Sequence, residues 1–163
     1  MEAKKKLTRE NKPTEELQDI VTKNFKGLEL SYKEAYYLDF EVDEDSGMIN
    51  SEKKVKHYTK DQVKRNMKAL KSAYLVEKGA ATPDEIISFR KKYHIPASTL
   101  SVVLGFSKNT ISIIENEGVT SLASGRLIKM CLNNLDIMSY YIKVCDAIDN
   151  HKKAEISQKL MQR

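Results

Sequence analysis

The sequence of 163 residues predicts a mainly α-helical fold, α+β overall, in which a C-terminal five-helix bundle follows a small N-terminal α/β module. Two observations lead to this prediction. From Thr59 onward, apolar residues recur at helical spacing between start and stop signals. Before Thr59, one segment alternates apolar and polar residues, as a half-buried strand does. A chain of this length fits one domain or two small ones.

The N-terminal part is expected to contain an arm and a small module. Residues 1–13 are polar and basic, with a net charge of +3, and we expect a disordered arm there. Residues 14–79 are expected to form a helix–strand–helix module. Apolar residues at helical spacing between Leu17 and Phe25 predict its first helix, which stops before Gly27.

The strand of this module is predicted over residues 36–42, and the cluster at 43–47 indicates a turn after it. Its second helix starts at Thr59, where Gln62 stands at the capping-box position, and ends at Gly79. The apolar stripe expected to be buried consists of Val63, Met67, Leu70 and Tyr74.

Residues 80–150 predict five short helices with tight links. The strongest start signal is the run from Thr82 to Glu85, which combines a capping hydroxyl, a proline at the first helical position and acids in the first turn. The last two of the five helices are predicted over 121–133 and 136–150. Residues 151–163 form a tail with a weak helical pattern.

The segment from Pro96 to Gly118 has the spacing of a helix-turn-helix. That motif needs two short helices that touch through a small residue and are joined by a turn too tight for a Cβ. Ser107 is predicted to cap the second helix and Gly118 to end it. The residues that meet the spacing requirements are Ala97, Leu100, Ser101, Leu104, Gly105, Phe106, Ile111 and Ile114.

The outward face of the second helix could contact DNA bases. Asn109 can bind adenine through two hydrogen bonds, and Ile113 can pack on a thymine methyl group. Lys108 and Asn116 are better placed for phosphates. The alternative is a surface helix whose polar face contacts only water. The candidate DNA-binding residues are Ser107, Lys108, Asn109, Thr110, Ser112, Ile113 and Asn116.

The charges are unevenly distributed along the chain. Residues 14–50 carry a net charge of −7, whereas residues 51–78 carry +6. Such blocks suggest two different partners, one of them nucleic acid, or they are simply solvated faces. The acids within 39–45 could be imagined as a divalent-metal site, but they lie on a turn and no histidine is near in sequence. We therefore expect no enzyme activity, no metal and no cofactor.

The remaining composition indicates a cytoplasmic protein without a membrane partner. No apolar run approaches the ~20 residues that a membrane-spanning helix needs, and the N-terminus has no apolar segment behind its charges. Cys131 and Cys145 stand among apolar neighbours, which favours buried free thiols over a redox role.

The run TPDEIISFRKKYHIPASTLSVVLGFSKNTISIIENEGVTS resembles the Cro and λ-repressor-like (XRE) helix-turn-helix, and most closely the C-terminal domain of MqsA-like antitoxins. The similarity covers residues 58–134, because HYTKDQVKRNMKALKSAYLVEKG resembles the linker helix of the same family. It implies a compact helical bundle that dimerises and binds a palindromic operator in double-stranded DNA. It also implies that Asn109 contacts bases and that Glu115-Asn116 packs back on the bundle.

The function implied is a transcriptional repressor that also serves as the autoregulating antitoxin of a type II toxin–antitoxin pair. The alternative is a stand-alone phage- or plasmid-type repressor with no toxin partner. The chain departs from the family at Ile113, where relatives favour arginine, and at Ala97, where glutamine is common. It also has none of the paired CxxC motifs of the family's zinc module, so a toxin would have to bind residues 14–57 without zinc.

Dimerisation is expected because one such domain covers only half of an operator. The apolar residues between 127 and 148 exceed what one small bundle obviously needs, and they could form either a dimer seam or a private core. Ile156 and Leu160 of the tail could extend that seam. The apolar residues in question are Leu127, Ile128, Cys131, Leu135, Ile137, Met138, Tyr141, Ile142, Val144 and Ile148.

Overall fold

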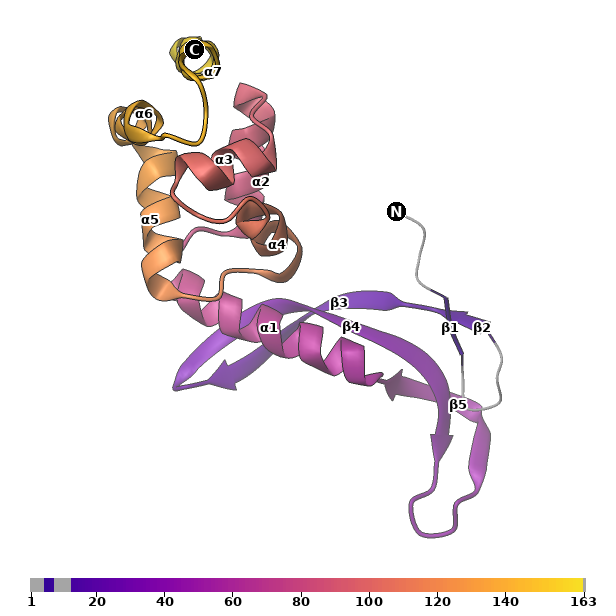
Figure 1. Ribbon diagram of the computed structural model, residues 1–163. Helices are drawn as coiled ribbons and strands as arrows, with labels where there is room; N and C mark the ends of the chain where they lie inside the picture. Colours follow the sequence, from indigo (N-terminus) through magenta and orange to yellow (C-terminus); the bar gives the residue numbers. More distant parts are fainter. Residues whose placement is uncertain (1–4, 8–12, 163) are drawn as a thin grey trace. The chain divides into compact units, whose positions relative to one another are not determined.

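A computed structural model describes residues 5–7 and 13–162 of the chain. Within these residues it contains seven helices and a three-stranded antiparallel sheet, so the fold is mixed α+β (Figure 1). The chain divides into an N-terminal unit, residues 1–70, and a C-terminal unit, residues 71–163. The division falls within helix α1 (Lys60–Glu77), whereas the boundary expected from the sequence lies after residue 79.

The sheet of the N-terminal unit is built on one long strand. Strand β4 (Leu28–Val42) pairs through its first half with β3 (Leu17–Phe25) and through its second half with β5 (Ile49–His57). The β3–β4 hairpin turns at Lys26 and Gly27, whose φ angles of 52° and 79° suit a two-residue turn of type I′. The order of the sheet is β3-β4-β5.

Two predictions for the N-terminal part were wrong. The helix expected between Leu17 and Phe25 is strand β3, because its spacing also fits a strand and the β-branched run in its middle favours one. Of the arm expected to be disordered, Lys5–Leu7 form strand β1, which pairs with β2 (Pro13–Glu15). Residues 1–4 and 8–12 of that arm lie outside the described residues.

Helix α1 begins with the predicted capping box. The backbone N–H of Gln62 donates to Thr59 Oγ1 at 3.2 Å, and the backbone N–H of Thr59 donates to Gln62 Oε1 at 2.9 Å. Its buried side in the N-terminal unit is polar, however. Gln62 and Asn66 are buried together with Leu70, whereas Val63 and Met67 of the predicted stripe are exposed. The prediction was wrong for Val63 and Met67, because the side-chain amide of Asn66 holds the other side of the helix on strand β4.

The C-terminal unit is a helical bundle around one apolar core. Helix α2 starts with the capping box predicted from Thr82 and Glu85. Helix α6 stops at Val144, earlier than the predicted position 150, and Asp149 then caps a further helix. The helices are α2 (Pro83–Tyr93), α3 (Ala97–Val103), α4 (Thr110–Glu117), α5 (Leu122–Asn133), α6 (Leu135–Val144) and α7 (Asn150–Met161).

The tail expected at 151–163 is therefore mostly helix α7, and it belongs to the bundle. Ile156 and Leu160 are 2% and 5% exposed within the core, so the proposal that they extend a dimer seam was wrong. Among the other candidates for that seam, only Val144 is largely exposed, at 55%. Most of these apolar residues thus lie in the core of the bundle or pack against it. None of the helices in the described part of the chain is both long and apolar enough to cross a membrane.

Candidate nucleic-acid interface

Helices α3 and α4 are joined by a tight turn, and α4 lies with one side in the core. Gly105 in the turn has a φ of +82°, a value that residues with a Cβ rarely adopt. Ile111 and Ile114 of α4 are 0% and 3% exposed, whereas Ile113 between them is 48% exposed. Helical periodicity thus separates a core side from a solvent side, as the spacing of the sequence predicted.

Helix α4 is capped from outside itself. The hydroxyl of Ser101, which is 0% exposed, accepts a hydrogen bond of 3.0 Å from Ile111 N and donates one of 2.9 Å to Ala97 O. The first N–H groups of a helix need such an acceptor, which the residue preceding the helix usually provides. Here that residue is Asn109, and its side chain makes no capping bond. Because α3 supplies the acceptor, the side-chain amide of Asn109 is not needed to cap the helix.

A charged pair fixes α4 against α2. Arg90 donates from Nε to Glu115 Oε1 at 2.5 Å and from Nη2 to Oε2 at 2.7 Å, and its Nη1 donates to Ile95 O at 3.2 Å. Two parallel bonds of this kind set orientation as well as distance. Glu115 was expected to pack on the bundle, but Arg90 was missed. The signal that could have found it is the single arginine in the helix that begins at Pro83.

The candidate DNA-binding residues lie together on the turn before α4 and on its solvent side. Asn109, Ser112, Ile113 and Asn116 follow the i, i+3, i+4, i+7 spacing of one helix face. Ser107, Lys108, Asn109, Ile113 and Asn116 are exposed, and Thr110 and Ser112 are half-buried.

Hydrogen bonds inside this segment leave two polar side chains uncommitted. Ser107 was expected to cap the helix, but α4 begins at Thr110, and the Ser107 hydroxyl lies 2.8 Å from the Thr110 hydroxyl. The Ser112 hydroxyl donates to Asn109 O at 2.8 Å, and Asn116 Nδ2 donates to Ser112 O at 2.7 Å. Lys108 and Asn109 make no side-chain hydrogen bond to any residue in the described ranges.

Several charged residues of the N-terminal unit form ion pairs with one another. Lys56 lies 2.9 Å from Asp19, Lys23 lies 3.2 Å from Glu34, and Lys53 lies 3.0 Å from Glu41. Arg65 binds both carboxylate oxygens of Glu16. These ion pairs bring together residues from different strands and from α1. The net charge of a sequence block is therefore a poor guide to the surface here.

Glu34 shows how tightly these charges are matched. Its side chain is 7% exposed, and burial alone would raise the pKa of this carboxyl. Hydrogen bonds from Lys23 at 3.2 Å and Tyr58 at 3.1 Å instead hold its pKa below the ordinary glutamate value. The charge of Glu34 is thus satisfied within the unit and is not presented to a partner.

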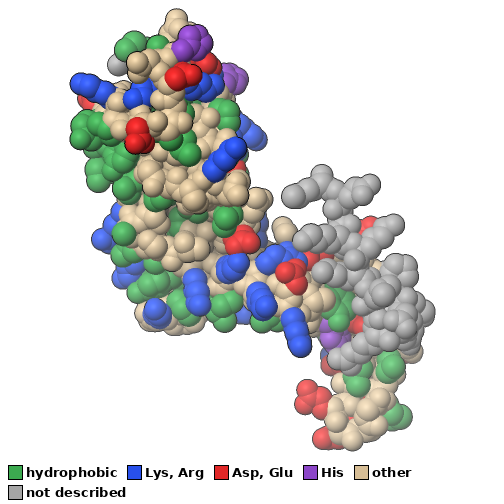
Figure 2. All heavy atoms as spheres, viewed as in Figure 1, with side chains coloured by type: hydrophobic (Ala, Val, Ile, Leu, Met, Phe, Trp, Pro, Cys, Tyr) green, Lys and Arg blue, Asp and Glu red, His purple; other side chains and the backbone are tan. Residues whose placement is uncertain are grey.

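Basic side chains gather along α1 (Figure 2). Lys60 and Lys64 are exposed and form no ion pair or hydrogen bond with the part of the chain that the structure describes. Lysines without a local partner are suited to nonspecific contact with phosphates.

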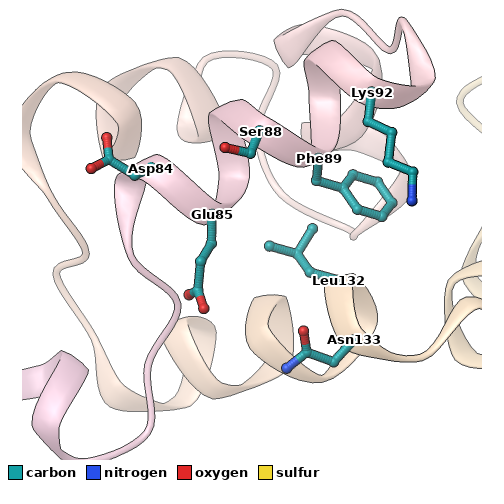
Figure 3. A pocket seen from close by; sticks show the side chains of 7 residues that line it. All are labelled: Asp84, Glu85, Ser88, Phe89, Lys92, Leu132 and Asn133. Carbon is teal, nitrogen blue, oxygen red and sulfur yellow. The ribbon is translucent and has the colours of Figure 1, made fainter.

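The C-terminal unit also has a shallow hollow between α2 and α5 (Figure 3), lined by Asp84, Glu85, Ser88, Phe89, Lys92, Leu132 and Asn133. Glu85, one of the two acids that line the hollow, closes the capping box with Thr82 and pairs with Lys129. Among the described residues, no three His, Cys, Asp or Glu side chains are grouped as a metal site would require. Within residues 39–45, Asp43 accepts from the backbone of Asp45 and Ser46, and Glu41 lies 3.0 Å from Lys53.

Comparison of the chain with protein-family models, with curated proteins and with solved structures finds no match.

Proposed function

We propose that the chain is a sequence-specific DNA-binding repressor whose C-terminal helices act as an XRE-type helix-turn-helix, with α4 in the major groove. The observation that carries the proposal is the external cap on α4. Ser101 satisfies the helix end, so Asn109 keeps a free amide at the point where such a helix first meets base edges. An asparagine amide can bind adenine N6 and N7 together.

The charge of the C-terminal unit supports the same function. Residues 71–163 contain thirteen of the 28 basic and nine of the 23 acidic residues, so four of the five net positive charges belong to this unit. A positive unit is attracted to DNA before any base is contacted. Lys108, exposed and unpaired beside Asn109, is suited to a phosphate.

The test is a binding titration of the full chain with DNA from upstream of its own gene and with an unrelated fragment. We expect Asn109→Ala to weaken binding to the upstream DNA by about 1–3 kcal/mol, or roughly 5- to 150-fold, with little effect on the unrelated fragment. Asn133→Ala, which removes an exposed asparagine from α5, is the matched control and should change neither. Equal binding by Asn109→Ala and the parent would show that α4 does not contact bases as proposed.

Whether the repressor is also an antitoxin is a separate point. Glu16, Asp19, Glu34 and Glu41 of the acidic block form ion pairs within the N-terminal unit, so part of the surface that could attract a basic toxin is neutralised, and the antitoxin role is supported chiefly by the family resemblance. A stand-alone repressor is the alternative. Co-expression with the product of the adjacent gene distinguishes the two, because an antitoxin should co-elute with its partner and a stand-alone repressor should not.

A further inference from the structure

Strand β3 is the edge of its sheet, and no strand in the described ranges pairs with its outer side (Figure 1). It spans nine residues, and its register with β4 is unbroken along the whole length. Proteins usually protect such an edge with a proline, a bulge, a short strand or charged side chains. β3 contains no proline and no bulge, its two charged residues, Asp19 and Lys23, are of opposite sign, and Ile20 in its middle is 74% exposed. This edge is therefore competent to pair with another strand.

The neighbouring contacts settle which backbone groups face the open edge. Asn66 of α1 binds both N and O of Ala35, at 2.7 and 2.9 Å, so the backbone of Ala35 points away from β3. Ala35 lies opposite Gln18, and opposite residues of an antiparallel pair direct their backbone groups either both inward or both outward. Gln18, Ile20, Thr22 and Asn24 therefore present N–H and C=O to the open edge.

We propose that the outer edge of β3 binds the same edge of a second copy of the chain, antiparallel, with Val21 opposite Val21 of the second copy. In this register every outward-facing residue meets another, which gives about eight hydrogen bonds between the copies. Across the contact, two apolar residues (Leu17 with Phe25), two amides (Gln18 with Asn24), two opposite charges (Asp19 with Lys23) and two β-branched residues (Ile20 with Thr22) lie opposite each other.

The two charged residues select this register over its neighbours. With Val21 at the centre, Asp19 of each copy lies opposite Lys23 of the other. Shifts that place either residue opposite itself bring like charges together, which is unfavourable across strands. The intermediate shifts place Asp19 opposite Val21 or Phe25, where it has no charged partner. Asp19 and Lys23 are 48% and 54% exposed, so both can accept a second partner beside those in their own chain.

This dimer goes beyond DNA binding and does not depend on it. A repressor of the proposed kind needs two copies, yet most of the apolar residues expected to join them at the C-terminal end are in a private core. The β3 edge offers a surface for that purpose in the other unit. A dimer that forms without binding DNA specifically would refute only the proposed function, and specific binding by a monomer would refute only the dimer.

The first test is the mass of the full chain in solution, measured by sedimentation equilibrium. We expect about twice the chain mass of 18.7 kDa. Ile20→Pro removes an outward N–H and leaves the bonds to β4 intact, since proline is tolerated at such edge positions. We expect it to weaken the dimer at least about tenfold. Ile20→Thr is the matched control, because it removes the same apolar side chain but keeps the N–H, and it should remain a dimer.

The second test measures proximity by cysteine cross-linking and does not depend on weakening the dimer. Opposite residues of a pair that lacks direct hydrogen bonds have Cα atoms about 4.5 Å apart, within the span of a disulfide. Val21→Cys should therefore cross-link two copies under mild oxidation. Thr22→Cys is the control: Thr22 is the more exposed residue, but its two copies would lie about 7–8 Å apart on a diagonal. Native Cys131 and Cys145 are buried and should not take part.

The outcomes are distinct. A parent chain that sediments as a monomer, an Ile20→Pro variant that dimerises as tightly as the parent, or a Thr22→Cys variant that cross-links as fast as Val21→Cys would each overturn the proposal. A monomeric parent would leave the edge for a strand of another protein. If Ile20→Pro does not fold, the cysteine pair decides alone.

Discussion

The capping of α4 by Ser101 makes a prediction that separates the seat of the helix from its outer face. Ser101→Ala removes the acceptor for Ile111 N, and both residues are 0% exposed, so no water can replace the hydroxyl without rearrangement. The other bond of Ser101, to Ala97 O, matters less because that carbonyl lies in a helix and keeps its backbone partner. The cost is therefore that of one buried N–H without an acceptor.

A buried donor left unsatisfied costs about 1–3 kcal/mol. For a unit the size of residues 71–163, each kcal/mol lowers the melting temperature by about 4–8 °C. Ser101→Ala should therefore lower the melting temperature of the C-terminal unit by about 4–24 °C. Its affinity for DNA should also fall, because the first turn of α4 frays, although Ser101 itself is too deeply buried to contact DNA.

Calorimetry of the full chain measures the stability change, and hydrogen exchange of the Ile111 amide locates it. Ser112→Ala is the control, since its hydroxyl only donates to the carbonyl of Asn109. It should change stability by less than about 0.5 kcal/mol. Protection of the Ile111 amide that is equal in Ser101→Ala and the parent would refute the external cap.

Three further predictions concern stability. Gly118→Ala should lower the stability measured by thermal melting by about 2–5 kcal/mol, and Gly105→Ala by about 1–2 kcal/mol. Both glycines have a positive φ, but only at Gly118 would a Cβ lie 2.4 Å from another side chain, that of Ser72, so equal losses would contradict this reasoning. Burial alone would raise the pKa of Glu85, yet hydrogen bonds, the largest from Lys129, lower it. The melting temperature should therefore drop as the pH falls below the ordinary glutamate pKa of 4.5, and it should drop less in Glu85→Gln; parallel profiles of the two proteins would refute this. Asn66→Asp should destabilise the N-terminal unit by about 1–3 kcal/mol in urea, because a carboxylate cannot donate to a backbone carbonyl, and an unchanged midpoint would argue against this contact.

The sequence predicted those features that depend on neighbouring residues. The capping boxes at Thr59 and Thr82 are confirmed, as are the turn glycine Gly105 and the inward direction of Ile111 and Ile114. Each of these follows from local spacing and backbone preference. The seven candidate DNA-binding residues could be placed on one face for the same reason, although their contact with DNA stays a prediction.

What could not be predicted depends on contacts between distant segments. The apolar spacing of β3 fits either a helix or a strand, and its pairing with β4 decides between them. The exposure of Val63 follows from the amide bonds of Asn66 to Ala35, thirty-one positions away. The external cap on α4 likewise joins Ser101 to a residue ten positions on. None of these contacts has a signature in a single sequence.

The amide seat of α1 has a consequence for how that helix can move. Apolar contacts tolerate rotation about the helix axis and sliding by part of a turn, because they have little directional preference. The two bonds from Asn66 to Ala35 do not, since a shift of one residue would turn the amide by about 100° and break both. Thermal motion of α1 over the sheet should therefore be limited to bending. Because α1 does not rotate about its axis, Val63 and Met67 keep pointing into solvent.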